Sequence, residues 1–291
     1  MTISAAEVKA LREMTGLGMM ECKKALEETA GDKDAAIELM RKKAGAKVEK
    51  KAGRTAADGL VSVVTQGNAI AMVEVNSETD FVAKGDEFRN FVTQLASCIA
   101  SNRPADVGAL MEQSIDGSKS VAKTLEAMVQ KLGEKMSIRR FETYTCKNTI
   151  GSYVHTTGKI AVLVEMEGGD ETLARDIAMH IAASRPQFIS PEEVPEKVKA
   201  REREFFTEQA KESGKPDNIV EKMVEGRINK FLGEICLLGQ PFVKDPDTRI
   251  ESLLQSASAK IVRFMRYEVG EGIEKKEDDF AAEVMAQVKG A

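Results

Sequence analysis

Two stretches of the chain show the same order of apolar and polar positions, and this repetition defines the centre of the protein. In the first stretch, apolar residues at 60–64 and 70–75 flank a turn at Gln66-Gly67-Asn68, which is typical of a β-hairpin. A helix follows, with apolar residues on one face up to Asn102-Arg103-Pro104. The second stretch repeats strand, turn, strand and helix, and its helix ends at Ser184-Arg185-Pro186. We therefore predict a core formed by internal duplication.

The two copies differ in length. Ile70 and Ile160 are 90 residues apart, whereas Pro104 and Pro186 are 82 apart, so the first copy contains eight additional residues. We place the additional residues around Thr79, Asp80, Phe81 and Val82. Because the second copy packs without such a segment, these residues are predicted to serve something other than the core.

Helical patterns flank this core. At the N-terminus, Ser4 and Glu7 form a capping box, a second helix starts near Met19, and Asp32 caps a third helix. Residues 41–54 are rich in Lys and Arg, and we interpret them as a solvated helix end and charged linker, with contact to an acidic surface as the alternative.

Further elements follow between and after the two copies. A helix at 121–132 and a strand at 136–144 lie between them, and a strand at 261–269 follows the second copy. Two helical patterns joined at Ser213-Gly214-Lys215-Pro216 predict an antiparallel helical hairpin. The apolar side of its first helix is predicted to contain Val194, Val198 and Phe205, and a last short helix to contain Phe280, Val284 and Val288.

Together these patterns predict an α+β fold with four parts. They are an N-terminal three-helix domain with a basic linker (1–54), a first core subdomain (55–140), a second core subdomain with antiparallel strands and a helical-hairpin insertion at about 190–230 (141–269), and a C-terminal helical module (270–291).

Composition narrows the choice of partner. The 291 residues have a formal net charge of -5, whereas nucleic-acid binding needs a strongly basic face, so we expect protein or small-molecule partners and no direct nucleic-acid contact. The four cysteines form no Cys-x-x-Cys pair, which argues against a zinc cage and a disulfide framework. No stretch approaches the roughly 18 apolar residues of a membrane span, so we expect a cytoplasmic protein.

Residues that commonly perform covalent catalysis are scarce. His155 and His180 lie in no metal-ligand spacing. His180 lies next to Ile181 on an apolar helix face, which favours a buried imidazole with satisfied hydrogen bonds over a general base. His155 lies at a hairpin tip, where solvation and a partner contact explain it equally well. We therefore predict no enzyme, no metal site and no bound cofactor.

Asp80 and Phe81 are the strongest candidates for a functional site. Asp80 could cap the following helix or cover a turn. Neither role requires an aromatic neighbour, and a core phenylalanine needs no additional segment to reach its place. We therefore predict that Phe81 is exposed and contacts another protein, with Asp80 beside it.

Met19 and Met20 begin the predicted second helix. Core packing is the default role of methionine, but two adjacent side chains on one helix cannot both face inward. One of them is therefore expected to face solvent or a partner. Cys22, in the same helix, is better explained as a small buried side chain than as a reactive thiol.

Two segments, TGLGMMECKKAL at 15–26 and EVNSETDFVAK at 74–84, resemble the signature motifs of the translation elongation factor Ts family. The similarity extends over essentially the whole chain, and the order of its parts resembles the longer bacterial form. The resemblance implies a guanine-nucleotide exchange factor that binds elongation factor Tu with GDP, displaces Mg²⁺ and promotes GDP release so that GTP can bind.

The resemblance also implies roles for particular residues. The three-helix domain would be similar to a ubiquitin-associated domain and would contact the partner's G domain through Met19, Met20 and Lys23. His155 would face the partner's third domain, the terminal helix would return to the G domain, and the helical hairpin serves homodimer formation in some members. The segment that intrudes near the partner's Mg²⁺ would be Thr79, Asp80, Phe81 and Val82.

Two other classes of function compete with this interpretation. A non-catalytic adaptor could bind ubiquitin-like or nascent-chain surfaces through its three-helix domain, but it would leave Asp80 and Phe81 unexplained. An enzyme with Asp80 as general base would need a nucleophile or a metal constellation, and the sequence near Asp80 offers neither.

Overall fold

A computed structural model describes residues 3–145, 147–212 and 214–274, the side chains at 41 and 44–50 excepted. The contacts divide the chain into two units, Met1–Thr143 with Glu268–Ala291, and Tyr144–Tyr267. Helices and small antiparallel sheets occur in both units, which confirms the predicted α+β class. The predicted helix around Phe280 lies outside the described residues.

Unit 1 begins with three helices, α1 (Ala5–Thr15), α2 (Met19–Glu28) and α3 (Lys33–Ala52). The predicted capping box of Ser4 and Glu7 opens α1, and the side chain of Asp32 caps α3. Leu11, Cys22 and Leu26 are fully buried between the helices. The small core of this part therefore follows from the apolar faces predicted from the sequence.

The basic stretch at 41–54 is not a linker. α3 continues through it to Ala52, and Gly45 lies inside the helix. The helix-end part of the interpretation is therefore confirmed for residues 41–52, and the linker part is wrong there. A glycine costs a helix only about 1 kcal/mol relative to alanine, so the long run of good helix formers around Gly45 outweighs it.

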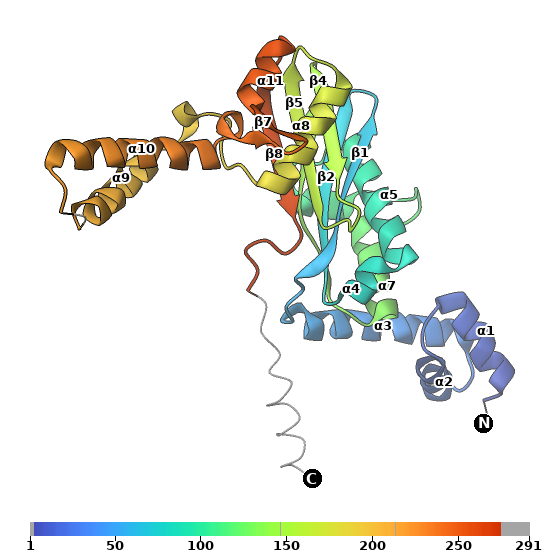
Figure 1. The fold of residues 1–291 in the computed structure, drawn as a ribbon. Helices are drawn as coiled ribbons and strands as arrows, with labels where there is room; N and C mark the ends of the chain where they lie inside the picture. Colours follow the sequence, from blue (N-terminus) through green and yellow to red (C-terminus); the bar gives the residue numbers. More distant parts are fainter. Residues whose placement is uncertain (1–2, 146, 213, 275–291) are drawn as a thin grey trace. The chain divides into compact units, whose positions relative to one another are not determined.

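The rest of unit 1 is a sheet with helices packed against it (Figure 1). Its strands are β1 (Asp58–Gln66), β2 (Ala69–Ser77) and β3 (Met136–Thr145), and its helices are α4 (Asp80–Lys84), α5 (Asp86–Asn102), α6 (Val107–Glu112) and α7 (Val121–Leu132). β2 is the middle strand and pairs antiparallel with β1, and all its residues are buried. α5 contacts both β1 and β2, so β2 lies inside the core of unit 1.

Unit 2 repeats this arrangement. Its sheet has the order β4 (Thr149–Val154), β5 (Ile160–Glu167) and β8 (Lys260–Glu268), and α8 (Glu171–Ser184) covers β4 and β5. A β-carbon added to Gly151 of β4 would lie 2.2 Å from the carbonyl of Ala174, so only glycine allows α8 to lie this close to the strand. The remaining elements are α9 (Glu196–Lys211), α10 (Asp217–Ile235), β6 (Pro241–Phe242), β7 (Asp245–Arg249) and α11 (Ile250–Ser256).

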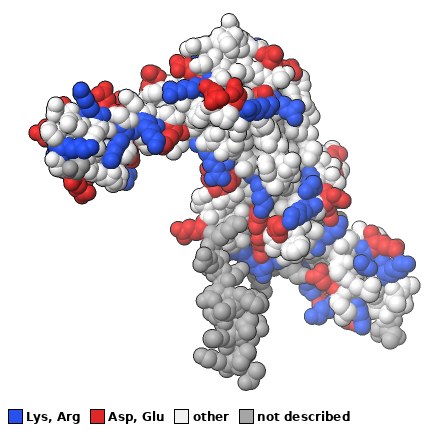
Figure 2. Space-filling model, in the orientation of Figure 1, with Lys and Arg blue, Asp and Glu red and all other residues white. Residues whose placement is uncertain are grey.

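α9 and α10 form the predicted helical hairpin (Figure 1). The interface between them contains Phe206 and not Phe205, which is 50% exposed. Val194 also lies before α9 begins. The sequence placed the apolar side of α9 one residue too early, because adjacent phenylalanines leave the helix face ambiguous. On the face drawn in Figure 2, Lys and Arg are interspersed with Asp and Glu along this hairpin.

The additional length of the first copy lies in two places. Residues 78–85 connect β2 to α5, whereas residues 168–170 suffice between β5 and α8. α5 also has 17 residues and α8 has 14, so the connection supplies five of the eight additional residues and the longer helix three. The longer connection contains α4, which the sequence did not predict as a helix.

Candidate functional site

The candidate site is the short helix α4, which follows directly after the buried strand β2. Thr79 is its N-cap, and its hydroxyl accepts a hydrogen bond from the backbone N–H of Val82 at 3.4 Å. Asp80 is therefore the first residue of the helix and not its cap, so that alternative is wrong. The Asp80 carboxylate pairs with Lys84 Nζ at 2.6 Å, one helical turn later.

Phe81 faces solvent, as the sequence predicted. Its side chain is 83% exposed, more than any other large hydrophobic side chain of the described residues. The next two residues have the opposite environment, since Val82 packs against the core and Ala83 is buried. α4 is thus held to unit 1 by one side and presents an aromatic ring on the other.

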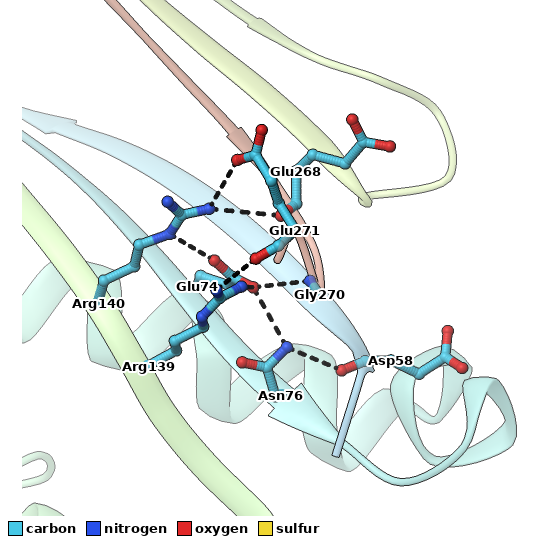
Figure 3. A network of polar contacts seen from close by, with 8 residues as sticks. All are labelled: Asp58, Glu74, Asn76, Arg139, Arg140, Glu268, Gly270 and Glu271. Atoms are coloured by element: carbon cyan, nitrogen blue, oxygen red, sulfur yellow. Dashed lines mark hydrogen bonds and ion pairs between the residues drawn. The ribbon is translucent and has the colours of Figure 1, made fainter. Parts of the chain in front are cut away.

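The strand that leads to α4 contains a buried ionic network (Figure 3). The Glu74 carboxylate, which is fully buried, accepts hydrogen bonds from Arg139 at 3.0 Å, from Arg140 at 2.6 Å and from the backbone N–H of Gly270 at 2.9 Å. Asn76 Nδ2 donates to Glu74 and to the carbonyl of Asp58. β2 is therefore fixed to β3, to β1 and to the return segment at 268–271.

The charge state of Glu74 follows from these contacts. Burial alone would raise the pKa of this carboxyl, but the Gly270 N–H and the guanidinium groups of Arg140 and Arg139 outweigh burial and hold the pKa below its ordinary value. Glu74 is therefore ionised at neutral pH. A buried charge with several hydrogen bonds gives the strand below α4 a single well-defined geometry.

The predicted contact residues of the N-terminal helices lie on the surface of α2. Met19 is 53% exposed and Met20 is 71% exposed, so both side chains face solvent where only one was expected to. They occupy the first turn of α2, before the apolar face of Cys22 and Leu26 begins. Lys23 Nζ lies 3.8 Å from Glu27 in an exposed pair on the same helix.

Two of the remaining candidates have structural partners. His155 is half-buried at the β4–β5 turn, and its Nδ1 lies 2.8 Å from the Thr157 hydroxyl. Cys22 is fully buried, which confirms the simpler interpretation of this thiol.

His180 is buried with both ring nitrogens satisfied, as predicted. Its Nε2 lies 2.9 Å from Gln240 Oε1, and its Nδ1 accepts from the backbone N–H of Val243 at 3.2 Å. Burial lowers the pKa of His180, and the hydrogen bond to Gln240 opposes part of this effect. The ring is therefore a neutral structural group.

Sequence reasoning missed two features near the candidate residues. Met14, in the last turn of α1, is 65% exposed and flanks the same Gly16–Gly18 turn as Met19 and Met20. Glu134 accepts two hydrogen bonds from Thr79, the residue before Asp80. Methionines on both sides of a glycine turn were a usable signal for the first feature, whereas nothing in the sequence indicated the second.

Two classes of site are absent from the described part of the chain. No three His, Cys, Asp or Glu side chains there are arranged to hold a metal ion. None of the described helices combines the length and apolar character that crossing a membrane requires.

Comparison with known proteins shows similarity to one family over the whole chain. Residues 78–271 match the family model described as elongation factor TS. Over the full length of both chains, the protein is 58% identical to elongation factor Ts of Thioalkalivibrio sulfidiphilus and 55% identical to that of Methylococcus capsulatus. It is also 53% identical to elongation factor Ts of Idiomarina loihiensis, over all of this chain and 99% of that protein.

Proposed function

The chain belongs to the elongation factor Ts family, and we propose that it opens the nucleotide site of its partner with the exposed ring of Phe81. The protein is a guanine-nucleotide exchange factor for elongation factor Tu in translation elongation. It makes and breaks no covalent bond, so its effect must come from binding energy alone.

The chemistry of nucleotide binding sets what the factor has to do. GTPases hold GDP through backbone amides, a lysine and a bridging Mg²⁺. A factor that displaces the metal weakens GDP binding without touching the base. Because coupling between two ligands is reciprocal, GTP that enters the emptied site drives the factor off again.

One observation carries the assignment to α4: the most exposed large hydrophobic side chain of the described residues lies on a connection that the second copy does not contain. The ring of Phe81 would be the group inserted into the partner. Asp80 stands beside it as a carboxylate toward the metal site. Thr79 and Val82 would hold α4 against the core of unit 1.

Magnitudes show that Phe81 cannot act alone. Burying a phenylalanine side chain contributes about 1.5–3 kcal/mol, which corresponds to roughly 10- to 100-fold in affinity. We therefore propose further contacts at Met19, Met20 and Lys23 on α2 and at His155 in the β4–β5 turn. The exposure of both methionines supports the contact at α2.

The test of the proposed insertion is the Phe81→Ala variant. We expect it to slow GDP release from the partner by about 10- to 100-fold and to leave complex formation largely intact, measured by stopped flow with fluorescent GDP. Val262→Ala is the control, since it also truncates an exposed hydrophobic side chain and lies outside every proposed contact. A Phe81→Ala variant that exchanges GDP as fast as the unmodified protein overturns the proposal.

The proposed contact at α2 is tested by the double variant Met19→Ser with Met20→Ser. We expect about tenfold weaker binding to the nucleotide-free partner in calorimetry, because two exposed apolar side chains lose their buried area. Unchanged affinity would show that Met19 and Met20 on α2 do not contact the partner.

We also infer two finer features of the architecture. The shared order of hairpin and helix in the two units, and the left-handed Arg103 and Arg185 that end α5 and α8, support an ancestral duplication. The compact packing of α1, α2 and α3 supports a domain similar to the ubiquitin-associated fold.

A homodimer through the hairpin of α9 and α10 is a separate proposal. Phe205 and Ile219 are both exposed there, one on each helix. Analytical ultracentrifugation of the protein and of Phe205→Glu is the test, and identical sedimentation of the two would argue against this contact.

A further inference from the structure

The base of α4 is held by a reciprocal pair of contacts with the segment between α7 and β3. Glu134 accepts a hydrogen bond from the backbone N–H of Thr79 at 3.0 Å and another from the Thr79 hydroxyl at 2.6 Å. In return, Glu78 accepts a hydrogen bond from the backbone N–H of Lys135 at 2.5 Å. Two adjacent residues of one segment are thus bonded to two adjacent residues of the other.

These contacts matter because α4 cannot fix its own orientation. The helix has five residues, and forming the first turn of a helix is unfavourable unless tertiary contacts stabilise it. Its own cap is weak, since the Thr79 hydroxyl lies 3.4 Å from the Val82 N–H. The same hydroxyl donates its proton to Glu134 over a much shorter distance. The Glu134 carboxylate therefore fixes Thr79, the residue that directly precedes Asp80 and Phe81.

The contacts of Glu78 and Thr79 with Glu134 and Lys135, called the clamp below, are also connected to the end of α3. The side-chain ammonium of Lys135 donates to the carbonyls of Ala52 and Arg54, each at 2.7 Å. The guanidinium of Arg54 lies 3.3 Å from Glu78. The segment that follows the three N-terminal helices and the base of α4 therefore share the same polar contacts.

We propose that Glu134 is a positioning residue for nucleotide exchange. It sets the direction of Phe81 by holding Thr79 at both its backbone N–H and its hydroxyl. This inference rests on the proposed role of Phe81 and adds to it the group that keeps the ring in place. Glu134 itself touches neither nucleotide nor metal in this proposal.

The first test is a double-mutant cycle. Glu134→Ala is expected to lower the maximal rate of GDP release at saturating factor by about five- to tenfold, since a misdirected ring loses its productive geometry, and to leave the half-saturating concentration nearly unchanged. The variant with both Glu134→Ala and Phe81→Ala is expected to be no slower than Phe81→Ala alone, because the clamp acts only through the ring. Glu112→Ala, an exposed glutamate of α6, is the matched control.

The outcomes separate the two proposals. A normal rate for Phe81→Ala overturns the role of the ring itself. A slow Phe81→Ala with a normal Glu134→Ala overturns only the clamp, and so does a double variant in which the two losses multiply.

A second variant keeps the test valid if Glu134→Ala folds poorly. Thr79→Val removes the hydroxyl at nearly constant shape and is expected to slow exchange about threefold, while Thr79→Ser restores it. Amide hydrogen exchange of residues 80–83 should become faster in Thr79→Val and return to normal in Thr79→Ser. Unchanged protection at these amides in Thr79→Val would contradict the clamp.

Discussion

The two sheets of the protein are built on the same plan, but the buried carboxylate of the middle strand is more heavily bonded in the first sheet than in the second. Each middle strand contains a Val-Glu pair whose carboxylate is buried, Glu74 in β2 and Glu165 in β5. Each carboxylate is neutralised from the third strand of its sheet, Glu74 by two arginines of β3 and Glu165 by Arg263 of β8. A buried acid paired across a strand is therefore a shared property of the two halves.

The halves differ where function is expected. The first half has α4 and Phe81 between its strand and its helix, and the network of Glu74 also fixes the return segment at Gly270. The second half makes the same connection with residues 168–170. Arg263, the charged partner of Glu165 on β8, is nearly half exposed, and its guanidinium carbon lies 3.8 Å from the ring centre of Tyr144. The half that contains α4 has the more heavily bonded strand next to this helix.

Glu74→Ala should have the larger effect of the two acid removals. It removes the carboxylate that two guanidinium groups and a backbone N–H share, so that Arg139 and Arg140 retain only their contacts outside β2, and breaking a buried ion pair costs about 3–5 kcal/mol. Because the pKa of Glu74 is lowered in the folded protein, its contribution is present at neutral pH and is lost as pH falls below about 4. Calorimetric unfolding and amide exchange at residues 268–271 would measure the loss.

Glu165→Ala is the matched variant in the second half. We expect the free energy of unfolding to fall by only about 1–2 kcal/mol, because water can hydrate the nearly half-exposed Arg263 guanidinium when the carboxylate is removed. Equal losses in the two variants would show that the additional contacts of Glu74 add nothing to stability.

Gly151→Ala tests the closer helix packing of the second half. The new β-carbon would lie 2.2 Å from the Ala174 carbonyl, so β4 or α8 must shift, at a cost of about 3 kcal/mol. The residue in the matching position of the first hairpin is Ser62, since Ser62 pairs with Val73 as Gly151 pairs with Val164. Ser62→Ala should change the unfolding temperature little, and a comparable loss there would refute the difference in packing.

The pH dependence of unit 2 should show the smallest effect. Because burial lowers the pKa of His180, the unfolded chain binds its proton more readily, so stability should decline as pH falls through about 6.5. The unfolding temperature measured between pH 8 and pH 5.5 should follow this direction. His180→Gln should remove the decline and His155→Gln should retain it, and a decline that persists in His180→Gln would assign it to another group.

Local patterns predicted the elements that depend on near neighbours. The capping box at Ser4, the two hairpins and the ends of α5 and α8 each follow from residues within one or two turns of one another. The exposure of Phe81 was also predictable, because the second copy showed how much chain the core required. In contrast, the course of α3 through residues 41–52 and the solvent-facing side of both Met19 and Met20 were missed, since helix length and burial depend on what packs alongside.

The sequence by itself determined the repeated α+β plan, the place of the insertion and the family. Only the tertiary structure decided which groups hold the insertion in place. Thr79 meets Glu134 across 55 residues, and Glu74 meets Gly270 across 196. Periodicity and capping record contacts within a few residues, whereas a hydrogen bond between distant residues exists only after the chain has folded and leaves no local pattern in the sequence.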